Sequence, residues 1–150
     1  MSCRRARKRG VWAAWLTPRL AELAAHFTIE ETSFFPAVSV ARTEDILLES
    51  LEEHLSLKRL LADLLSLDVT DVHFEPKLHV LKEQAEHHHK EEEGDLFPKV
   101  KKVLDSAARE KLGREMESIL EALIHREPRH MVPAQTEEAA PLPPSQPSRS

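Results

Sequence analysis

The sequence predicts an all-α fold, an up-down antiparallel helical bundle, from three observations. Glycine occurs only 3 times in 150 residues and aromatic residues make up 5%, while 31% of the residues are charged. Such a composition is typical of long helices. Apolar residues recur at helical spacing in four runs, and the connections between these runs are short, which favours antiparallel neighbours.

The first two helices are predicted at residues 18–37 and 43–67. Pro18 suits the first turn of a helix, where the backbone N–H that proline lacks has no partner within the helix. The second run reads EDILLESLEEHLSLKRLLADLLSLD and places four leucines on one apolar stripe. These leucines are Leu47, Leu51, Leu61 and Leu65.

The other two helices are predicted at residues 75–104 and 106–126. Pro98 is expected to kink the third helix, because its ring presses on the carbonyl of Gly94 four residues earlier. The fourth helix is amphipathic, and its apolar stripe contains Leu112, Met116, Ile119, Leu120 and Leu123. One helical domain is therefore expected over residues 18–126.

The two ends of the chain differ from this domain. Residues 1–17 hold five basic side chains and no acidic one, followed by VWAAWL. This apolar run is shorter than the roughly 7–15 residues of a signal peptide, so we expect a basic leader that is disordered or an artefact of the assumed translation start. Residues 127–150 contain six of the ten prolines and are predicted to form a disordered Pro-rich tail.

Composition also excludes several functions. No run approaches the ~20 apolar residues that cross a membrane. The net charge of −5 argues against nucleic acid as a partner. Cys3 is the only cysteine, which excludes an internal disulfide and makes a cytoplasmic location the default expectation. Tyrosine is absent, so the chain cannot be a tyrosyl-radical enzyme.

The most informative feature is a repeated motif, HFTIEETSFFP at residues 26–36 and HHKEEEGDLFP at residues 88–98. In register, His26 matches His88 and Glu30 matches Glu92. A histidine and a carboxylate one helical turn apart point the same way and can serve one metal cluster. Isolated His-x-x-x-Glu spacings are common in this Glu-rich chain, so the specificity lies in the duplication. Two copies predict a two-metal site between helices.

Both pairs continue the inner apolar stripes of their helices. Ionisable groups at such positions are costly unless they are paired or bind metal. His54 lies on the inner edge of the second helix in the same way. The predicted ligand set is therefore His26, Glu30, His54, His88 and Glu92.

The residues beside these ligands receive weaker predictions. His87 and His89 are rotated by about 100° to either side of His88 and are expected to flank the site. Glu31 and Glu93 are expected to face outward or to stabilise their helices. The other histidines are assigned no role.

The donor types select among metals. Three imidazoles and two carboxylates without sulfur disfavour structural zinc or an iron–sulfur cluster and suit iron, with manganese as an alternative. A buried salt-bridge network is the competing interpretation. Lys58 is the one basic residue that lies near the inner stripes, so metal is favoured.

The repeated motif, with Glu53 and His54 on the helix between its copies, resembles the hemerythrin-like HHE cation-binding family over about residues 18–126. The resemblance implies a four-helix bundle with a non-haem di-iron centre. It also implies that Glu30 and Glu92 bridge the irons and that His26, His54 and His88 cap them. O2 or NO would occupy an open position.

The chain departs from that family at its start. The family has an earlier helix that supplies one more histidine, and no histidine precedes His26. The first family helix is thus missing or replaced by the basic leader, which would leave an apolar groove. We expect a truncated gene model. The alternatives are that the helix at 106–126 fills the groove, or that two chains form a homodimer that covers it.

Three functions remain open from sequence. The first is a di-iron protein that binds O2, a related small molecule or iron for carriage, sensing or stress handling, and that is not an enzyme. The second is a di-iron oxidoreductase, a ferroxidase or peroxide-handling enzyme. The third is a helical interaction module without metal.

Overall fold

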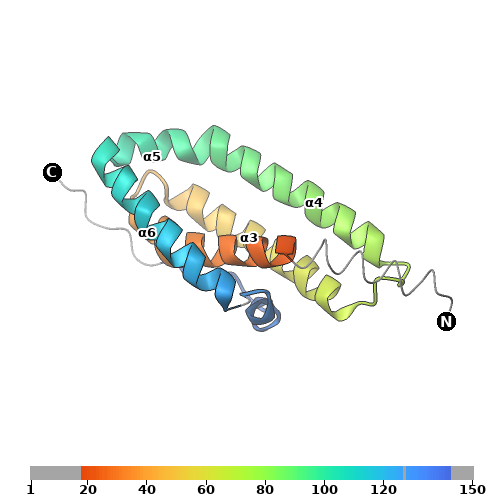
Figure 1. Ribbon diagram of the computed structural model, residues 1–150. Coiled ribbons are helices and arrows are strands. Elements are labelled where there is room, and N and C mark those ends of the chain that lie inside the picture. Colours follow the sequence, from red (N-terminus) through yellow and green to blue (C-terminus); the bar gives the residue numbers. More distant parts are fainter. Residues whose placement is uncertain (1–17, 127, 143–150) are drawn as a thin grey trace.

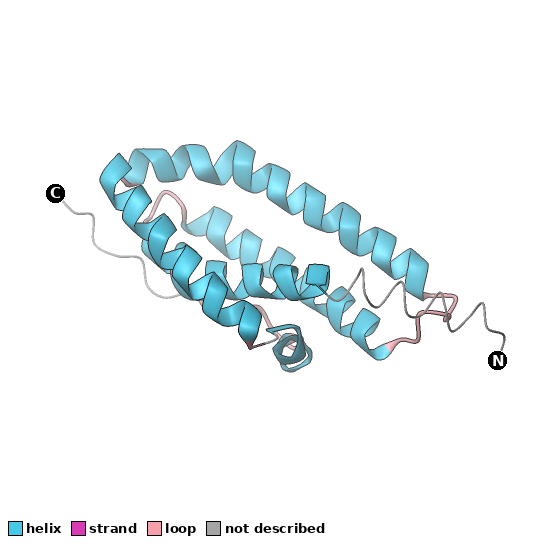
Figure 2. Cartoon of the chain, viewed as in Figure 1, coloured by secondary structure: helices cyan, strands magenta, loops and turns pink. Residues whose placement is uncertain are grey.

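The computed structural model describes residues 18–126 and 128–142. The basic leader expected at residues 1–17 lies outside this range. The described residues form a bundle of helices that run alternately up and down (Figures 1 and 2). The predicted all-α, up-down antiparallel bundle is confirmed.

The described part of the chain starts in an α-helix at residues 18–29. The elements that follow are η1 (Glu30–Phe34), α2 (Phe35–Val38), α3 (Glu44–Ser66), α4 (Phe74–Glu91), η2 (Glu92–Leu96), α5 (Phe97–Val103), α6 (Ser106–His125) and η3 (Pro128–Gln135). The predicted helix boundaries thus agree with the structure to within a few residues. Figure 1 shows α4 and α5 as one long curved rod that covers one side of the bundle.

Two apolar clusters hold the bundle together, one toward each end. The first joins the helix at 18–29 to α3 and α4 through Leu20, Ala24, Phe27, Leu57, Leu61, Leu64, Phe74, Leu81 and Val132. The second joins α2, α3, α5 and α6 through Phe35, Val38, Leu47, Leu51, Leu96, Val100 and Leu112. Along the sequence, four of the predicted ligands lie between residues of these two clusters: Glu30, His54, His88 and Glu92. A polar layer therefore interrupts an otherwise apolar core.

Both copies of the repeated motif contain a short π-helix directly before the Phe-Pro pair. The backbone N–H of Phe35 donates to the carbonyl of Glu30, and that of Phe97 donates to the carbonyl of Glu92. Proline has no N–H for the carbonyl four residues earlier, and the wider π spacing occurs at this gap. The predicted kink at Pro98 therefore takes the form of a π-turn followed by α5.

The π-turn also changes which phenylalanine packs into the core. A regular helix would place Phe34 inward after His26 and Glu30. The structure instead buries Phe35 completely and leaves Phe34 half-buried. In an α-helix, a residue five positions on is rotated by about 140°, but a π-turn brings that residue back over Glu30. The predicted ligand Glu30 and the core residue Phe35 therefore lie on the same face of the helix.

The structure departs from the predicted disordered tail for residues 128–142. Val132 is buried in the first apolar cluster, and Leu142 packs against the second. The side chain of Arg59 donates to the carbonyls of Thr136 and Glu137, at 2.9 and 3.2 Å. The few apolar residues between the prolines find complementary surface on the bundle, which composition alone does not reveal.

Helix α6 contacts η1, and its Leu112 and Met116 pack on the second apolar cluster. Helix α6 therefore packs against the first copy of the motif and the second apolar cluster. The predicted truncation, the filling of the groove by this helix and the homodimer stay predictions. Among the described residues, no helix combines the length and apolar composition needed to cross a membrane.

Candidate metal centre

Four of the five predicted ligands converge in the polar layer. Donor atoms of Glu30, His54, His88 and Glu92 all lie within 4.8 Å of one another, and all four residues are buried. They come from η1, α3, α4 and η2. The repeated spacing therefore brings the carboxylates of both pairs to one place, together with His88 and His54.

Contacts within this group are close. Nε2 of His54 lies 3.0 Å from Oε2 of Glu30, and Nε2 of His88 lies 2.6 Å from Oε1 of Glu92. The two Nε2 atoms are 3.1 Å apart. Four donor atoms, two nitrogens and two oxygens, thus face a single point.

His26 lies at the edge of the cluster. Its Nε2 contacts Oε1 of Glu30 and lies 4.0 Å from Oε2 of Glu92. Its side chain is 40% exposed, whereas those of His54 and His88 are 1% and 2% exposed. The fifth predicted ligand thus meets both carboxylates, but from the solvent side.

Three buried atoms of the cluster form no hydrogen bond within the described structure. They are Nε2 of His26, Oε2 of Glu30 and Oε1 of Glu92. Each lies near another donor atom without hydrogen-bond geometry, and buried polar atoms are rarely left so. A cation bound among them satisfies all three at once, so these residues fit a metal ion.

A second layer of groups holds the imidazoles in place. Nδ1 of His54 lies 2.8 Å from Oε2 of Glu31, whose Oε1 accepts from Nζ of Lys58 at 2.7 Å. Nδ1 of His88 contacts Glu53. A carboxylate on one ring nitrogen directs the other nitrogen toward a metal and makes it more basic.

The outward orientation predicted for Glu31 is therefore wrong. Its side chain is only 10% exposed, and that of Lys58 is 4% exposed. Lys58 is the buried cation that the salt-bridge interpretation requires, but it binds Glu31 and not Glu30 or Glu92. Glu93 is exposed, as expected.

Aromatic rings enclose the buried side of the cluster. The His54 ring stacks on Phe35 with centroids 5.5 Å apart and lies 4.8 Å from the ring of Phe27. Both phenylalanines are buried. Water is thereby excluded on the side of His54.

The family comparison agrees with this geometry. The model of the hemerythrin HHE cation-binding domain matches residues 13–100, more than half of the chain and all five predicted ligands. The chain belongs to this hemerythrin HHE family. Neither the curated proteins nor the solved structures contain a match. The family and the buried His/Glu group together assign cation binding to this HHE domain.

In the metal-free HHE domain, the neighbouring carboxylates favour the protonated form of His88. Burial opposes a charge on His88, but Glu30, Glu92 and Glu53 outweigh it and raise the pKa of His88 to about 11. Burial likewise opposes a charge on Glu30, yet three histidines lower the pKa of its carboxyl well below the ordinary range. Burial and the neighbouring Glu30 raise the pKa of Glu92. In the metal-free site, protons therefore supply positive charge that a bound metal ion would otherwise supply.

We expect the metal-free HHE domain to lose stability as the pH rises above about 6.5. His88 loses its proton near pH 6.5 when unfolded but near 11 when folded. Its contribution to the free energy of unfolding is therefore complete below pH 6.5 and disappears toward pH 11. The slope is at most about 1.4 kcal/mol per pH unit. Thermal melting of chelator-treated protein between pH 6.5 and 10 measures this slope. His88→Gln should flatten it, and an equal slope in both proteins contradicts the assignment.

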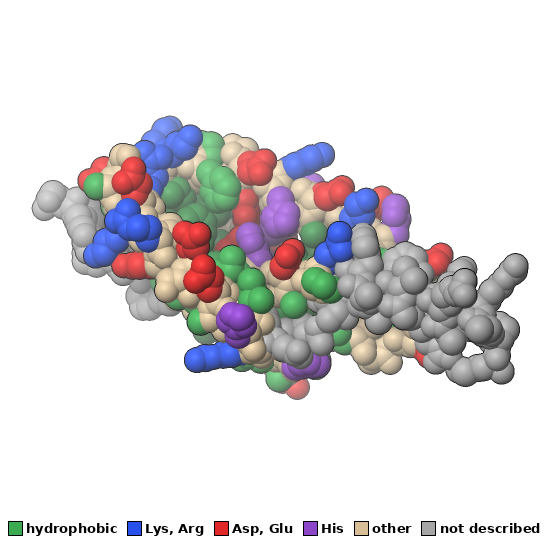
Figure 3. Space-filling view, viewed as in Figure 1, with side chains coloured by type: hydrophobic (Ala, Val, Ile, Leu, Met, Phe, Trp, Pro, Cys, Tyr) green, Lys and Arg blue, Asp and Glu red, His purple; other side chains and the backbone are tan. Residues whose placement is uncertain are grey.

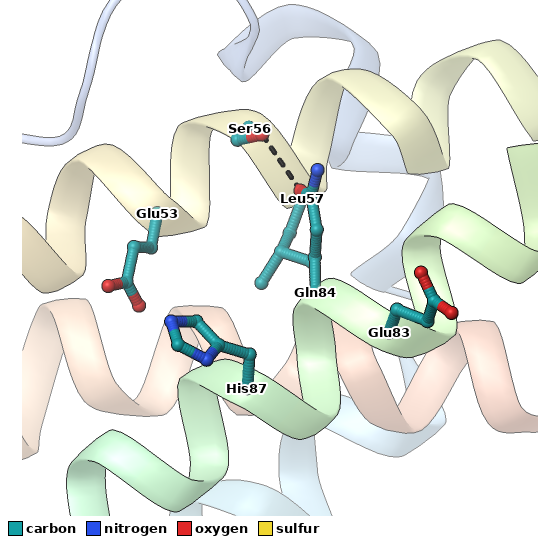
Figure 4. Close-up of a pocket in the computed structure, with 6 residues that line it drawn as sticks. All are labelled: Glu53, Ser56, Leu57, Glu83, Gln84 and His87. Atoms are coloured by element: carbon teal, nitrogen blue, oxygen red, sulfur yellow. Dashed lines mark hydrogen bonds between the residues drawn. The ribbon is translucent and has the colours of Figure 1, made fainter.

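The remaining histidines differ in their positions. His87 is 71% exposed and lies 3.0 Å from Glu91. His87 lines a surface pocket of about 410 Å³ between α3 and α4. Figure 4 shows its ring pointing toward Glu53. His89 lies on the opposite side of α4, with its ring edge-on to that of His26 at 5.2 Å. His89 therefore flanks the site beside His26, and His87 lies on the other side of α4, next to Glu53.

The surface near the site has two further features. Figure 3 shows histidine atoms at the surface in the middle of one face, with acidic side chains nearby. Three carboxylates, those of Glu49, Glu53 and Glu91, form a second group at the seam of α3 and α4. A neighbouring carboxylate, that of Glu53, raises the pKa of Glu91.

Proposed function

We propose that this HHE domain binds two non-haem iron ions and uses them to bind O2 or a related small molecule such as NO. One observation supports two positions above all others. Each central carboxylate divides its oxygens between two groups of histidines. One oxygen of each lies toward His54 and His88, and the other lies toward His26.

The first position would be held by Nε2 of His54, Nε2 of His88, Oε2 of Glu30 and Oε1 of Glu92. The second would be held by Nε2 of His26 with the opposite oxygen of each carboxylate. A carboxylate that offers one oxygen to each of two ions is the bridging arrangement of di-metal helical bundles. The short contacts in the metal-free site support this proposal, since donors without hydrogen-bond geometry converge there.

The donor set supports iron over other metals. Imidazole and carboxylate suit iron and manganese, and no sulfur is among the converging donors. Manganese remains the alternative ion. A ferrous pair, when bound, supplies electrons for the reduction of O2.

The protein's own residues shape the access of small molecules. Phe27 and Phe35 close the site beside His54, whereas His26 lies 40% exposed at the opposite edge. A small ligand would therefore reach the second position, next to His26, without crossing the core. Glu31 and Glu53 hold the buried imidazoles in orientation while this ligand exchanges.

Metal content of the purified full chain tests the proposal. We expect about two iron ions per chain after anaerobic loading with ferrous iron and desalting, and a visible absorbance that changes reversibly with O2. His88→Ala removes a buried donor of the first position and should lose most of the iron. His79→Ala is the matched control, because His79 is 70% exposed and pairs with Glu83, which is 65% exposed.

Other outcomes identify the competing functions. Sustained turnover of ferrous iron or peroxide would assign an oxidoreductase. A folded chain that binds no iron or manganese would contradict the proposal. The helical interaction module would then be the remaining candidate function.

A further inference from the structure

We propose that His89 is a ligand of the second metal position, beside His26. This inference rests on the proposed two-metal function and adds a residue that the repeated motif does not contain. Four observations support it: the unequal numbers of donors, the spacing of the rings, the side of α4 on which His89 lies, and its exposure.

The two positions have unequal numbers of donors. The first has two imidazoles and two carboxylate oxygens, all buried. The second has one imidazole, that of His26, with Oε1 of Glu30 and Oε2 of Glu92. An ion held by three protein donors needs at least one more group to reach four-coordination.

The spacing of the rings fits a shared ion. With metal–nitrogen bonds of ~2.0–2.1 Å, two imidazoles on one ion have ring centroids about 4.5–5.5 Å apart. The rings of His26 and His89 are 5.2 Å apart and edge-on. The pair that serves the first position, His54 and His88, has centroids 4.8 Å apart and the same edge-on arrangement.

The helix places His89 on the correct side. Successive residues of α4 are rotated by about 100°. His88 points into the bundle, His87 turns toward α3, and His89 turns toward the helix at 18–29, which carries His26. With His89 included, each position has two imidazoles and one oxygen from each carboxylate.

Exposure gives His89 the freedom to move onto the ion. The residue is exposed, while its ring still contacts those of His26 and His88, at 5.2 and 5.9 Å. No close packing against the core has to be broken when the ring turns. A second position completed by an exposed ligand also binds its ion more weakly than the first.

Ferrous iron binding to the full chain, measured anaerobically by titration and by metal analysis after desalting, tests the inference. We expect wild type to hold two ions. His89→Ala should hold one and bind the second about 10–100-fold more weakly, with unchanged affinity for the first. His87→Ala is the matched control: it removes the neighbouring exposed imidazole and should keep both ions.

Two further readouts separate ligation from a structural effect. Free imidazole added to His89→Ala should restore the second ion, because the position is open to solvent. Helix content and melting temperature of the metal-free variant should equal those of wild type. If His89→Ala binds two ions as tightly as wild type, His89 is not a ligand. If wild type itself binds fewer than two, the two-metal function fails, and this inference fails with it.

Discussion

Glu30→Ala should abolish iron binding at both positions of the HHE domain. Glu30 directs one oxygen toward His54 and contacts His26 with the other, so its removal takes a donor from each ion. Loss of a group that merely orients a metal ligand weakens binding about 10–100-fold. Loss of this shared donor should therefore weaken the binding of both ions by more than about 100-fold. Metal analysis after anaerobic loading measures the effect.

The repeated motif supplies the control for this variant. Glu93 belongs to the same kind of Glu-Glu doublet but is exposed, so Glu93→Ala should keep both ions. Circular dichroism of the metal-free proteins verifies that each variant is folded. A folded Glu30→Ala protein that retains one tightly bound ion would show that Glu30 does not bridge.

Lys58→Ala should cause a large loss of stability, about 3–5 kcal/mol. Its ammonium group lies 2.7 Å from Glu31, and both side chains are at least nine-tenths buried. Without Lys58, Glu31 keeps a buried negative charge, and among the described residues His54 is left to balance it. The free energy of unfolding from urea denaturation, with and without metal, measures the loss.

An exposed pair of the same type gives the comparison. Nζ of Lys77 lies 2.8 Å from Asp63, with side chains 35% and 53% exposed. Lys77→Ala should cost less than about 1 kcal/mol. The double variant Lys58→Met with Glu31→Gln should regain much of the loss, because it buries no unpaired charge. Equal losses from the two alanine variants would mean that burial does not strengthen the Lys58–Glu31 pair.

The sequence was sufficient for the fold and for the position of the candidate site. Helical periodicity located all four main helices, since each must bury an apolar stripe. The duplicated histidine–carboxylate spacing selected His88 and Glu92 among many similar pairs. The structure places both in the buried cluster.

The groups around the ligands could not be predicted, because they depend on contacts between helices. Glu31 follows Glu30 by about 100° and would face solvent on an isolated helix. It turns inward because α3 brings Lys58 and His54 to the same edge. The contact between His26 and His89 likewise requires two helices to meet. The packing of residues 128–142 depends on a surface that only the folded bundle creates.

The π-turns separate the chemistry of each motif from its packing. Each glutamate is the first residue of its π-turn, so the histidine–carboxylate pair ends where the turn begins. Deletion of one residue inside the first turn would restore α-helical geometry and make Phe35 the fourth residue after Glu30, a position that an α-helix also places on that face. The second apolar cluster would then keep Phe35, and the donor pair would keep its own spacing. In this domain the π-turn therefore absorbs one extra residue between the metal donors and the core.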